Sequence, residues 1–199
     1  MEAKLPDGRR VELREDGTWS FSAHHMKESP NRGGFRGVAW GATRAEVAAS
    51  EPSAPVREEA SFLVYETRLA EMDAEVLYFF VDDQLVRGKL FVTQSFQNEY
   101  RYVMKRDELE ELLVAKYGQP TETNQHWIGD LYRDDRADWG MAVATGDLSW
   151  YTRWDEEHTV VLLALTGEGF ESHLQVEYSS VELVGLESAA ARSRDLGQL

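Results

Sequence analysis

The chain contains no cysteine and, set against its acidic residues, few basic ones. Without cysteine it can form no disulfide bond, thiolate nucleophile or cysteine-ligated zinc or iron–sulfur site. Its 21 Lys+Arg against 36 Asp+Glu give a formal net charge of −15. Because such a chain repels phosphate groups and no basic stripe interrupts the acidity, we expect no nucleic-acid partner and no binding to an anionic membrane surface.

Long apolar runs are missing as well. No run approaches the length of a membrane span, so we expect no transmembrane segment. The N-terminal sequence MEAKLPDGRR has no signal-peptide core. The localisation therefore stays open. The protein would be periplasmic or exported if a signal peptide was removed and a start methionine supplied, and cytoplasmic otherwise.

The composition is that of a globular protein, since 199 residues with 42% hydrophobic and 11% aromatic content can form a packed core. Near the N-terminus, apolar and polar residues alternate on both sides of an Asp16-Gly17 turn, which predicts a β-hairpin within residues 1–23. A polar stretch predicts a linker at 24–34. Residues 185–199 are expected to be a weakly helical or disordered tail.

The segment WGATRAEVAASEP predicts a first helix. Thr43 and Glu46 have the spacing of a capping box, in which each side chain bonds a free backbone N–H at the helix start. Pro52 ends the pattern, so we expect a helix near 43–51.

A second and stronger helix is expected at 106–117. Leucines recur with helical spacing, and Asp107 and Glu110 repeat the capping pattern. Gly118 and Pro120 then provide a C-terminal cap and a stop.

Strand-like segments follow each helix. They occupy residues 61–70, 74–83 and 85–96 after the first helix, and 126–134, 139–146, 148–154, 159–167 and 171–180 after the second. Two of them, 74–83 and 159–167, are apolar on both faces, as central strands are. We therefore expect an α+β fold with a mostly antiparallel sheet and two short helices packed on one face. The domain would span 35–184 and contain the unit of one helix plus strands twice, at about 35–100 and 101–184.

The segments WGATRAEV and AKYGQP resemble the two helix boundaries of small bacterial outer-membrane lipoproteins of the SmpA/OmlA type. Two such units sharing one antiparallel sheet would resemble the beta-lactamase inhibitor protein. The segment LPDGRRVELREDGTW is similar to a short N-terminal hairpin of exported bacterial proteins. The resemblance implies a bacterial binding or scaffolding module without catalysis, associated with the cell envelope or exported, and it carries over no catalytic residues.

Metal and catalytic motifs are weak. His24, His25 and Glu28 look like metal ligands, but consecutive side chains in an extended linker point apart and no third ligand is placed. We therefore predict no metal, no cofactor and no catalytic residue. The alternative is a hydrolytic or metal-dependent enzyme in which His126, His158 and His173 converge with carboxylates.

The aromatic segment LSWYTRW is the strongest candidate binding element. Trp150 and Trp154 lie on one face of the expected strand, and Tyr151 lies on the other. Such tryptophans usually belong to a core, whereas helices that cover one sheet face could leave aromatic residues exposed for binding. The sequence favours a non-catalytic binding or interaction module for a protein or a small apolar ligand. It does not predict an oligomeric state.

Overall fold

The computed structural model describes residues 2–4, 10–13, 19–21 and 33–186. The chain divides into two compact units, residues 1–32 and 33–199. The N-terminal unit contains three short antiparallel strands, β1 (Glu2–Lys4), β2 (Arg10–Leu13) and β3 (Trp19–Phe21), in the order β1-β2-β3. The β2–β3 pair confirms the expected hairpin, and β1 was not predicted. The Asp16-Gly17 turn and His24, His25 and Glu28 lie outside the described residues.

The second unit begins with a small hairpin and a helix and continues into a large sheet. Its first half contains β4 (Gly34–Phe35), β5 (Val38–Ala39), α1 (Arg44–Ser50), β6 (Arg57–Glu59), β7 (Phe62–Leu69), β8 (Met72–Val81) and β9 (Gln84–Val92). Its second half contains α2 (Tyr100–Tyr117), β10 (Glu122–Trp127), the 3-10 turn η1 (Arg136–Asp138), α3 (Trp139–Thr145), β11 (Leu148–Asp155), β12 (Thr159–Glu168) and β13 (Glu171–Ser180). Gly34, expected in the linker, belongs to β4.

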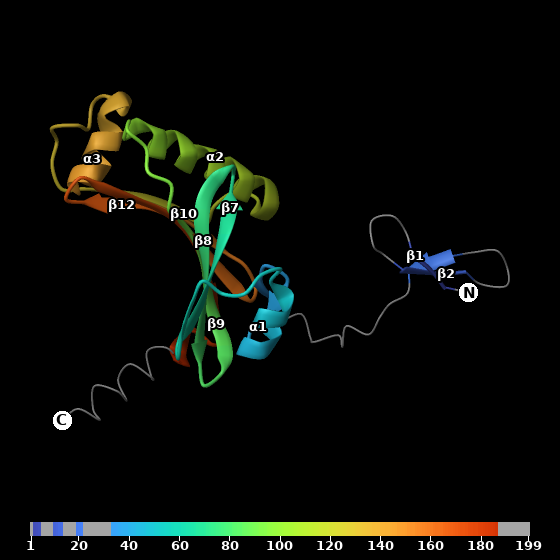
Figure 1. The fold of residues 1–199 in the computed structure, drawn as a ribbon. Coiled ribbons are helices and arrows are strands. Elements are labelled where there is room, and N and C mark those ends of the chain that lie inside the picture. The colour runs from blue at the N-terminus through green and yellow to red at the C-terminus, as the bar shows by residue number, and fades with distance from the viewer. Residues whose placement is uncertain (1, 5–9, 14–18, 22–32, 187–199) are drawn as a thin grey trace, which may run out of the picture. The chain divides into compact units, whose positions relative to one another are not determined.

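Eight strands form one antiparallel sheet in the order β10-β11-β12-β13-β9-β8-β7-β6 (Figure 1). Each half contributes a four-stranded meander that follows a helix, and the two meanders join through their last strands, β9 and β13. The expected α+β class with a mostly antiparallel sheet is confirmed. The second half also contains α3, which the expected unit of one helix plus strands did not include. The doubly apolar segments form β8 and β12, which both lie inside the sheet, as predicted.

The first helix begins as its sequence predicts. The Thr43 side chain accepts a hydrogen bond from the Glu46 N–H, and the Glu46 carboxylate accepts one from the Thr43 N–H at 2.8 Å. The capping box at the start of α1 is therefore present in full.

The predicted start of the second helix is wrong. Helix α2 begins at Tyr100, six residues before the expected start, so Asp107 and Glu110 lie within it. Glu110 instead accepts two hydrogen bonds from the guanidinium of Arg106, at 2.6 and 2.9 Å. Arg106 is fully buried, so its bonds to Glu110 satisfy a charge that would be costly to leave unpaired.

The strand expected at 139–146 is also wrong, because these residues form α3. A short apolar run fits a buried strand or a buried helix equally well. Tertiary packing decides for the helix. Gly140 lies so close to the backbone of Glu99 and Tyr100 that a Cβ there would be 2.3 Å from it. Ala142 and Val143 are fully buried.

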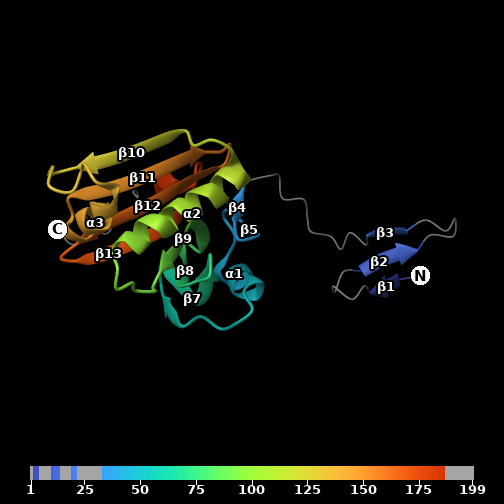
Figure 2. The same cartoon turned by 90° about the horizontal axis from the view of Figure 1, so that it is seen from above.

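The helices pack on one face of the sheet, as seen from above in Figure 2. The core on this side includes Val76, Leu90, Val176 and Leu163, which are register neighbours across four adjacent strands. In the described part of the chain, no helix has the length and apolar character needed to cross a bilayer.

Candidate functional site: the uncovered face of the sheet

The structure buries the two tryptophans that the sequence offered as a binding stripe. Trp150 is 5% exposed and Trp154 is 1% exposed. The indole of Trp150 packs edge-on against Trp139 of α3, and the guanidinium of Arg106 lies 3.7 Å from its ring centroid. The indole N–H of Trp154 donates to the Gly118 carbonyl at 3.0 Å. Both side chains belong to the core because α3 and the longer α2 extend the helical cover that the sequence predicted.

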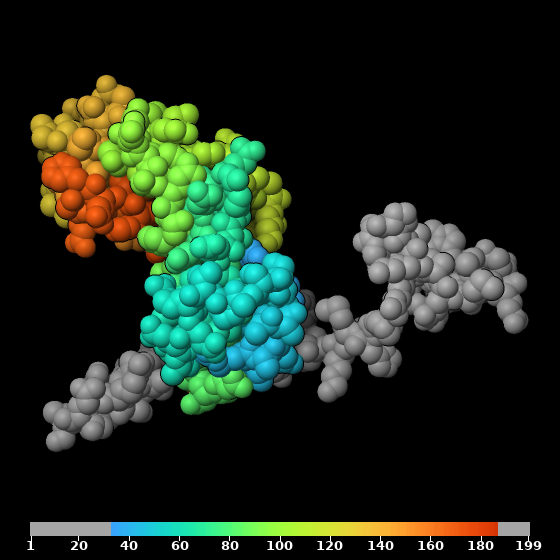
Figure 3. All heavy atoms as spheres, viewed as in Figure 1, coloured from blue at the N-terminus to red at the C-terminus, as the bar shows by residue number. Residues whose placement is uncertain are grey.

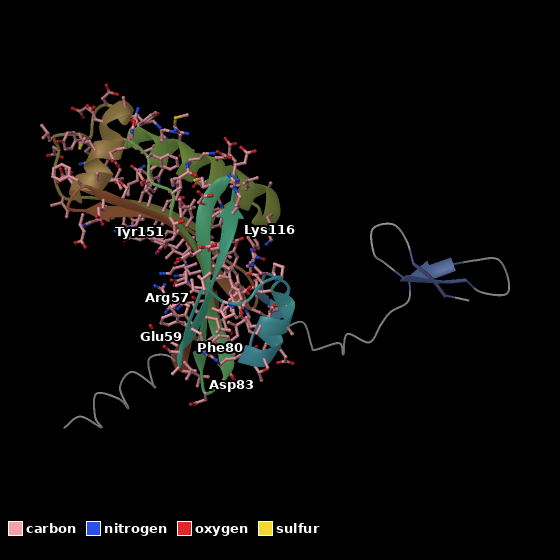
Figure 4. The ribbon with its side chains drawn as sticks, viewed as in Figure 1. Arg57, Glu59, Phe80, Asp83, Lys116 and Tyr151 are labelled. Atoms are coloured by element: carbon pink, nitrogen blue, oxygen red, sulfur yellow. The ribbon has the colours of Figure 1, made fainter. Side chains whose placement is uncertain are left out.

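Tyr151 behaves differently, because neighbouring residues of a strand point to opposite faces. It is half-buried and, by strand alternation, points away from the helices. Figure 4 labels it on the same side of the ribbon as Arg57 and Glu59, which lie on β6. The expected aromatic binding face therefore loses Trp150 and Trp154 but keeps Tyr151.

The histidines offered for an enzyme site do not come together. His126 lies on β10 and His173 on β13, with β11 and β12 between them. His158 lies in the turn that joins β11 to β12, where its ring nitrogens are 3.6 Å from the carboxylates of Glu157 and Glu182. Among the described residues, no three His, Asp or Glu side chains are grouped as metal ligands.

The face opposite the helices is the candidate site, and we call it the uncovered face because no described helix packs on it. The strand registers place on it Phe62, Val64, Leu77, Phe79, Arg87, Lys89, Phe91, Gln175, Glu177, Val160, Leu162, Ala164 and Tyr151. Most of these side chains are half-buried. The space-filling view shows an indentation on this side, between the orange strands of the second half and the cyan strands of the first (Figure 3).

Charged residues form the centre of the uncovered face. Glu177 on β13 accepts from Arg87 at 3.1 Å and lies 3.3 Å from the Nζ of Lys89, both on β9. On either side of this trio the neighbouring strands carry apolar residues. Leu77 is the partner of Lys89, and Leu162 is the partner of Glu177. Each half of the sheet therefore contributes one apolar patch. The first patch consists of Phe62, Val64, Leu77 and Phe79, and the second of Val160, Leu162 and Ala164. The charged strip, which consists of Arg87, Lys89 and Glu177, lies between them.

Arginines cover part of the first apolar patch. Arg57 on β6 reaches across β7 to pair with Glu75 on β8 at 3.7 Å, and its guanidinium lies 5.6 Å from the ring centroid of Phe62. Phe62 in turn contacts Phe79, whose ring lies 4.1 Å from the guanidinium of Arg87. Such contacts let long side chains shield aromatic rings while their charges stay near water.

One end of the uncovered face opens into a cleft of about 460 Å³. The last register pair of β9 and β13 is Phe91 with Gln175, and beyond it the two strands separate. Aromatic rings line the space between them, including Phe91, which packs 5.8 Å from the His173 ring. Burial raises the pKa of the Tyr102 phenol, which also lines the cleft, so this hydroxyl stays a hydrogen-bond donor.

The chain matches no protein-family model, no curated protein and no solved structure. Sequence reasoning missed the charged strip of Arg87, Lys89 and Glu177, because these residues come from two strands about 90 positions apart and only their pairing unites them. The alternation of Lys89 and Phe91 along one strand was the available signal.

Proposed function

We propose that the protein is a non-catalytic binding module that engages a protein partner through the uncovered face. The single observation that carries the proposal is the half-buried set of aromatic, aliphatic and arginine side chains on a broad sheet face that no described helix covers. Aromatic residues and arginine are enriched at protein interfaces, and their loss often costs about 2 kcal/mol of binding free energy or more.

The shape of the face favours a protein over a small apolar ligand. The apolar patches lie across several strands and flank the charged strip, so they form a broad shallow surface. A small apolar ligand is usually held in an enclosed, mainly apolar cavity. The resemblance to SmpA/OmlA-type lipoproteins implies the same class of function, a binding or scaffolding role, and remains part of the proposal.

The hydrolytic alternative is the weaker proposal. It rests on the convergence of His126, His158 and His173, which the positions of their strands and turn do not support. The proposal of a binding module needs no such convergence.

Affinity capture tests the proposal with a double variant of the uncovered face, Leu77→Thr with Tyr151→Thr. Both positions are half-buried, and threonine keeps the strand propensity while removing apolar surface. The matched control is Met104→Ser with Leu112→Ser, which removes two apolar side chains that are 57% and 54% exposed on α2. Immobilised parent and variant chains would be compared for the proteins that they retain.

We expect one specific protein to be retained by the parent and the α2 control, and to be reduced at least about tenfold by the double variant. The thermal midpoints of all three chains are measured alongside, so that loss of folding is recognised. Equal retention by the double variant and the parent, or loss only in the α2 control, would refute the proposal.

A further inference from the structure

We infer that the cleft between β9 and β13 binds a basic side chain on an extended segment of the partner, and that Phe170 closes over it. This inference rests on the proposed binding function, because it names the chemistry of the partner at one end of the same face. The cleft is distinct from the charged strip, and different elements build its walls: the end of β9, the start of α2 and the β12–β13 turn.

Phe170 is the most telling residue of the cleft. Its φ of 68° lies in the left-handed region, which disfavours bulky side chains, and its ring is 71% exposed. Only its backbone serves the fold, through an N–H that donates to the Ala144 carbonyl at 2.8 Å. A positive φ at both central residues is what a two-residue hairpin turn requires, and Asp82-Asp83 share it, so the conformation of Phe170 serves the β12–β13 turn. The exposed ring itself is free to contact a ligand in the cleft.

The edge of β13 beside the cleft has no strand partner among the described residues. Residues Glu171 to Leu174 pair with β12 on their other side. An extended peptide can add to such an edge through backbone hydrogen bonds, while neighbouring pockets select its side chains. The free edge of four residues suits a short segment.

The charge of the cleft selects a cation. Glu99 and Glu171 line it, and no lysine or arginine is among its lining residues. Glu99 uses one oxygen to accept from the Ser172 hydroxyl at 2.9 Å, which leaves its other oxygen for a ligand. A guanidinium also binds aromatic faces, and Arg101 of this chain already lies 4.8 Å from the ring centroid of Phe96 at the cleft.

A binding titration tests the inference with a defined probe. The probe is the dye-labelled peptide acetyl-Gly-Thr-Val-Arg-Val-Thr-Gly-amide, added to the full chain and followed by fluorescence anisotropy. A second peptide carries glutamate in place of the arginine. Acetyl-arginine amide, which lacks the extended backbone, is the unlabelled competitor. The chains are the parent, Phe170→Asn, Glu171→Gln and the control Leu131→Asn, whose leucine is 80% exposed in a loop away from the cleft.

We expect the arginine peptide to bind at least about tenfold more tightly than the glutamate peptide. Phe170→Asn should weaken the binding of the arginine peptide by a similar factor. The thermal midpoint of this variant should stay the same or rise, because asparagine tolerates the left-handed conformation. Glu171→Gln should weaken peptide binding several-fold, and Leu131→Asn should leave peptide binding unchanged.

Equal affinity for the two peptides, full binding by Phe170→Asn, or a large loss of stability in that variant would each overturn the inference. Complete displacement by equimolar acetyl-arginine amide would show a pocket for small cations and would overturn strand addition. The arginine peptide could fail to bind while capture of the partner protein still depends on Leu77 and Tyr151. That result would refute only the inference about the cleft, and the proposed function would stand.

Discussion

At the residue scale, one glycine fixes how the N-terminal part of the second unit meets the sheet. Gly88 lies on β9 between Tyr78 and Tyr178, and the Phe35 ring fills the space above it. A Cβ on Gly88 would lie 2.1 Å from the ring of Phe35. A glycine inside a strand often marks such a close approach.

We predict that Gly88→Ala lowers the free energy of unfolding by about 1–3 kcal/mol, the usual cost of overpacking a core. Denaturant titration measures it. Gly185→Ala is the matched control, since no heavy atom lies within 4 Å of a Cβ built there. Adding Phe35→Ala to Gly88→Ala should cost less than the sum of the two single changes. Purely additive costs would contradict the proposed contact.

The buried tryptophans give a second prediction. Trp150→Ala and Trp154→Ala should each lower the free energy of unfolding by about 3–5 kcal/mol, because each leaves a large cavity under the helices. Tyr151→Ala, one position away but on the uncovered face, should cost less than half as much. Denaturant unfolding of the three variants and the parent measures these differences in the free energy of unfolding. Near-parental stability of either tryptophan variant would place that side chain outside the core.

Tyr78 makes the free energy of unfolding depend on pH in the alkaline range. Burial and a hydrogen bond donated to the Glu51 carboxylate raise the pKa of its phenol above the ordinary value of about 10. In the unfolded chain the phenol ionises above about pH 10, while in the folded chain it keeps its proton. The unfolded state then binds fewer protons, so stability falls as pH rises above about 10.

We therefore expect the urea midpoint of the parent to fall between pH 9 and pH 11, a range about one unit to either side of the ordinary tyrosine pKa. Tyr78→Phe should show a shallower fall, and the remaining slope belongs to other buried phenols such as Tyr178, whose pKa burial also raises. Identical slopes for the two proteins would contradict this role of Tyr78.

At the element scale, local sequence was a good guide where the signal was local. Thr43 and Glu46 specify the start of α1 through a pair of side-chain bonds three residues apart, and the structure has both bonds. The start of α2 was missed because Asp107 and Glu110 have the same spacing inside a helix, where Arg106 is the partner of Glu110. Helix α3 was missed because its apolar run is short and tertiary contacts at Gly140 decide its conformation.

The capping box yields a prediction for α1. Thr43→Ala should lower the free energy of unfolding by about 1 kcal/mol, since the Glu46 N–H loses its side-chain acceptor. Thr43→Ser keeps the hydroxyl and should stay near the parent. Thermal or denaturant unfolding distinguishes the two, and equal stability of the alanine and serine variants would show that the cap contributes nothing.

At the scale of the whole molecule, the sheet has two unlike faces because the described helices pack on only one of them. Each half supplies a four-stranded meander, the first half adds α1 and the second adds α2 and α3, and these helices lie on the same side of the sheet. The other side is left with the charged strip at the junction and one apolar patch in each half. Alternation along the strands predicted that Tyr151 would face away from Trp150. The junction of β9 with β13, which assembles the strip, could not be predicted because it joins strands far apart in the sequence.

Side-chain oxidative footprinting of the chain, with and without its captured partner, tests whether the uncovered face is the binding surface. Backbone exchange cannot separate the two faces of a strand, whereas side-chain oxidation can, because neighbouring side chains point to opposite faces. We predict protection of Phe79, Phe91 and Tyr151 on the uncovered face and none of Met104 on the outer side of α2. Protection confined to Met104, with the three aromatic residues unchanged, would contradict the claim that the uncovered face is the binding surface.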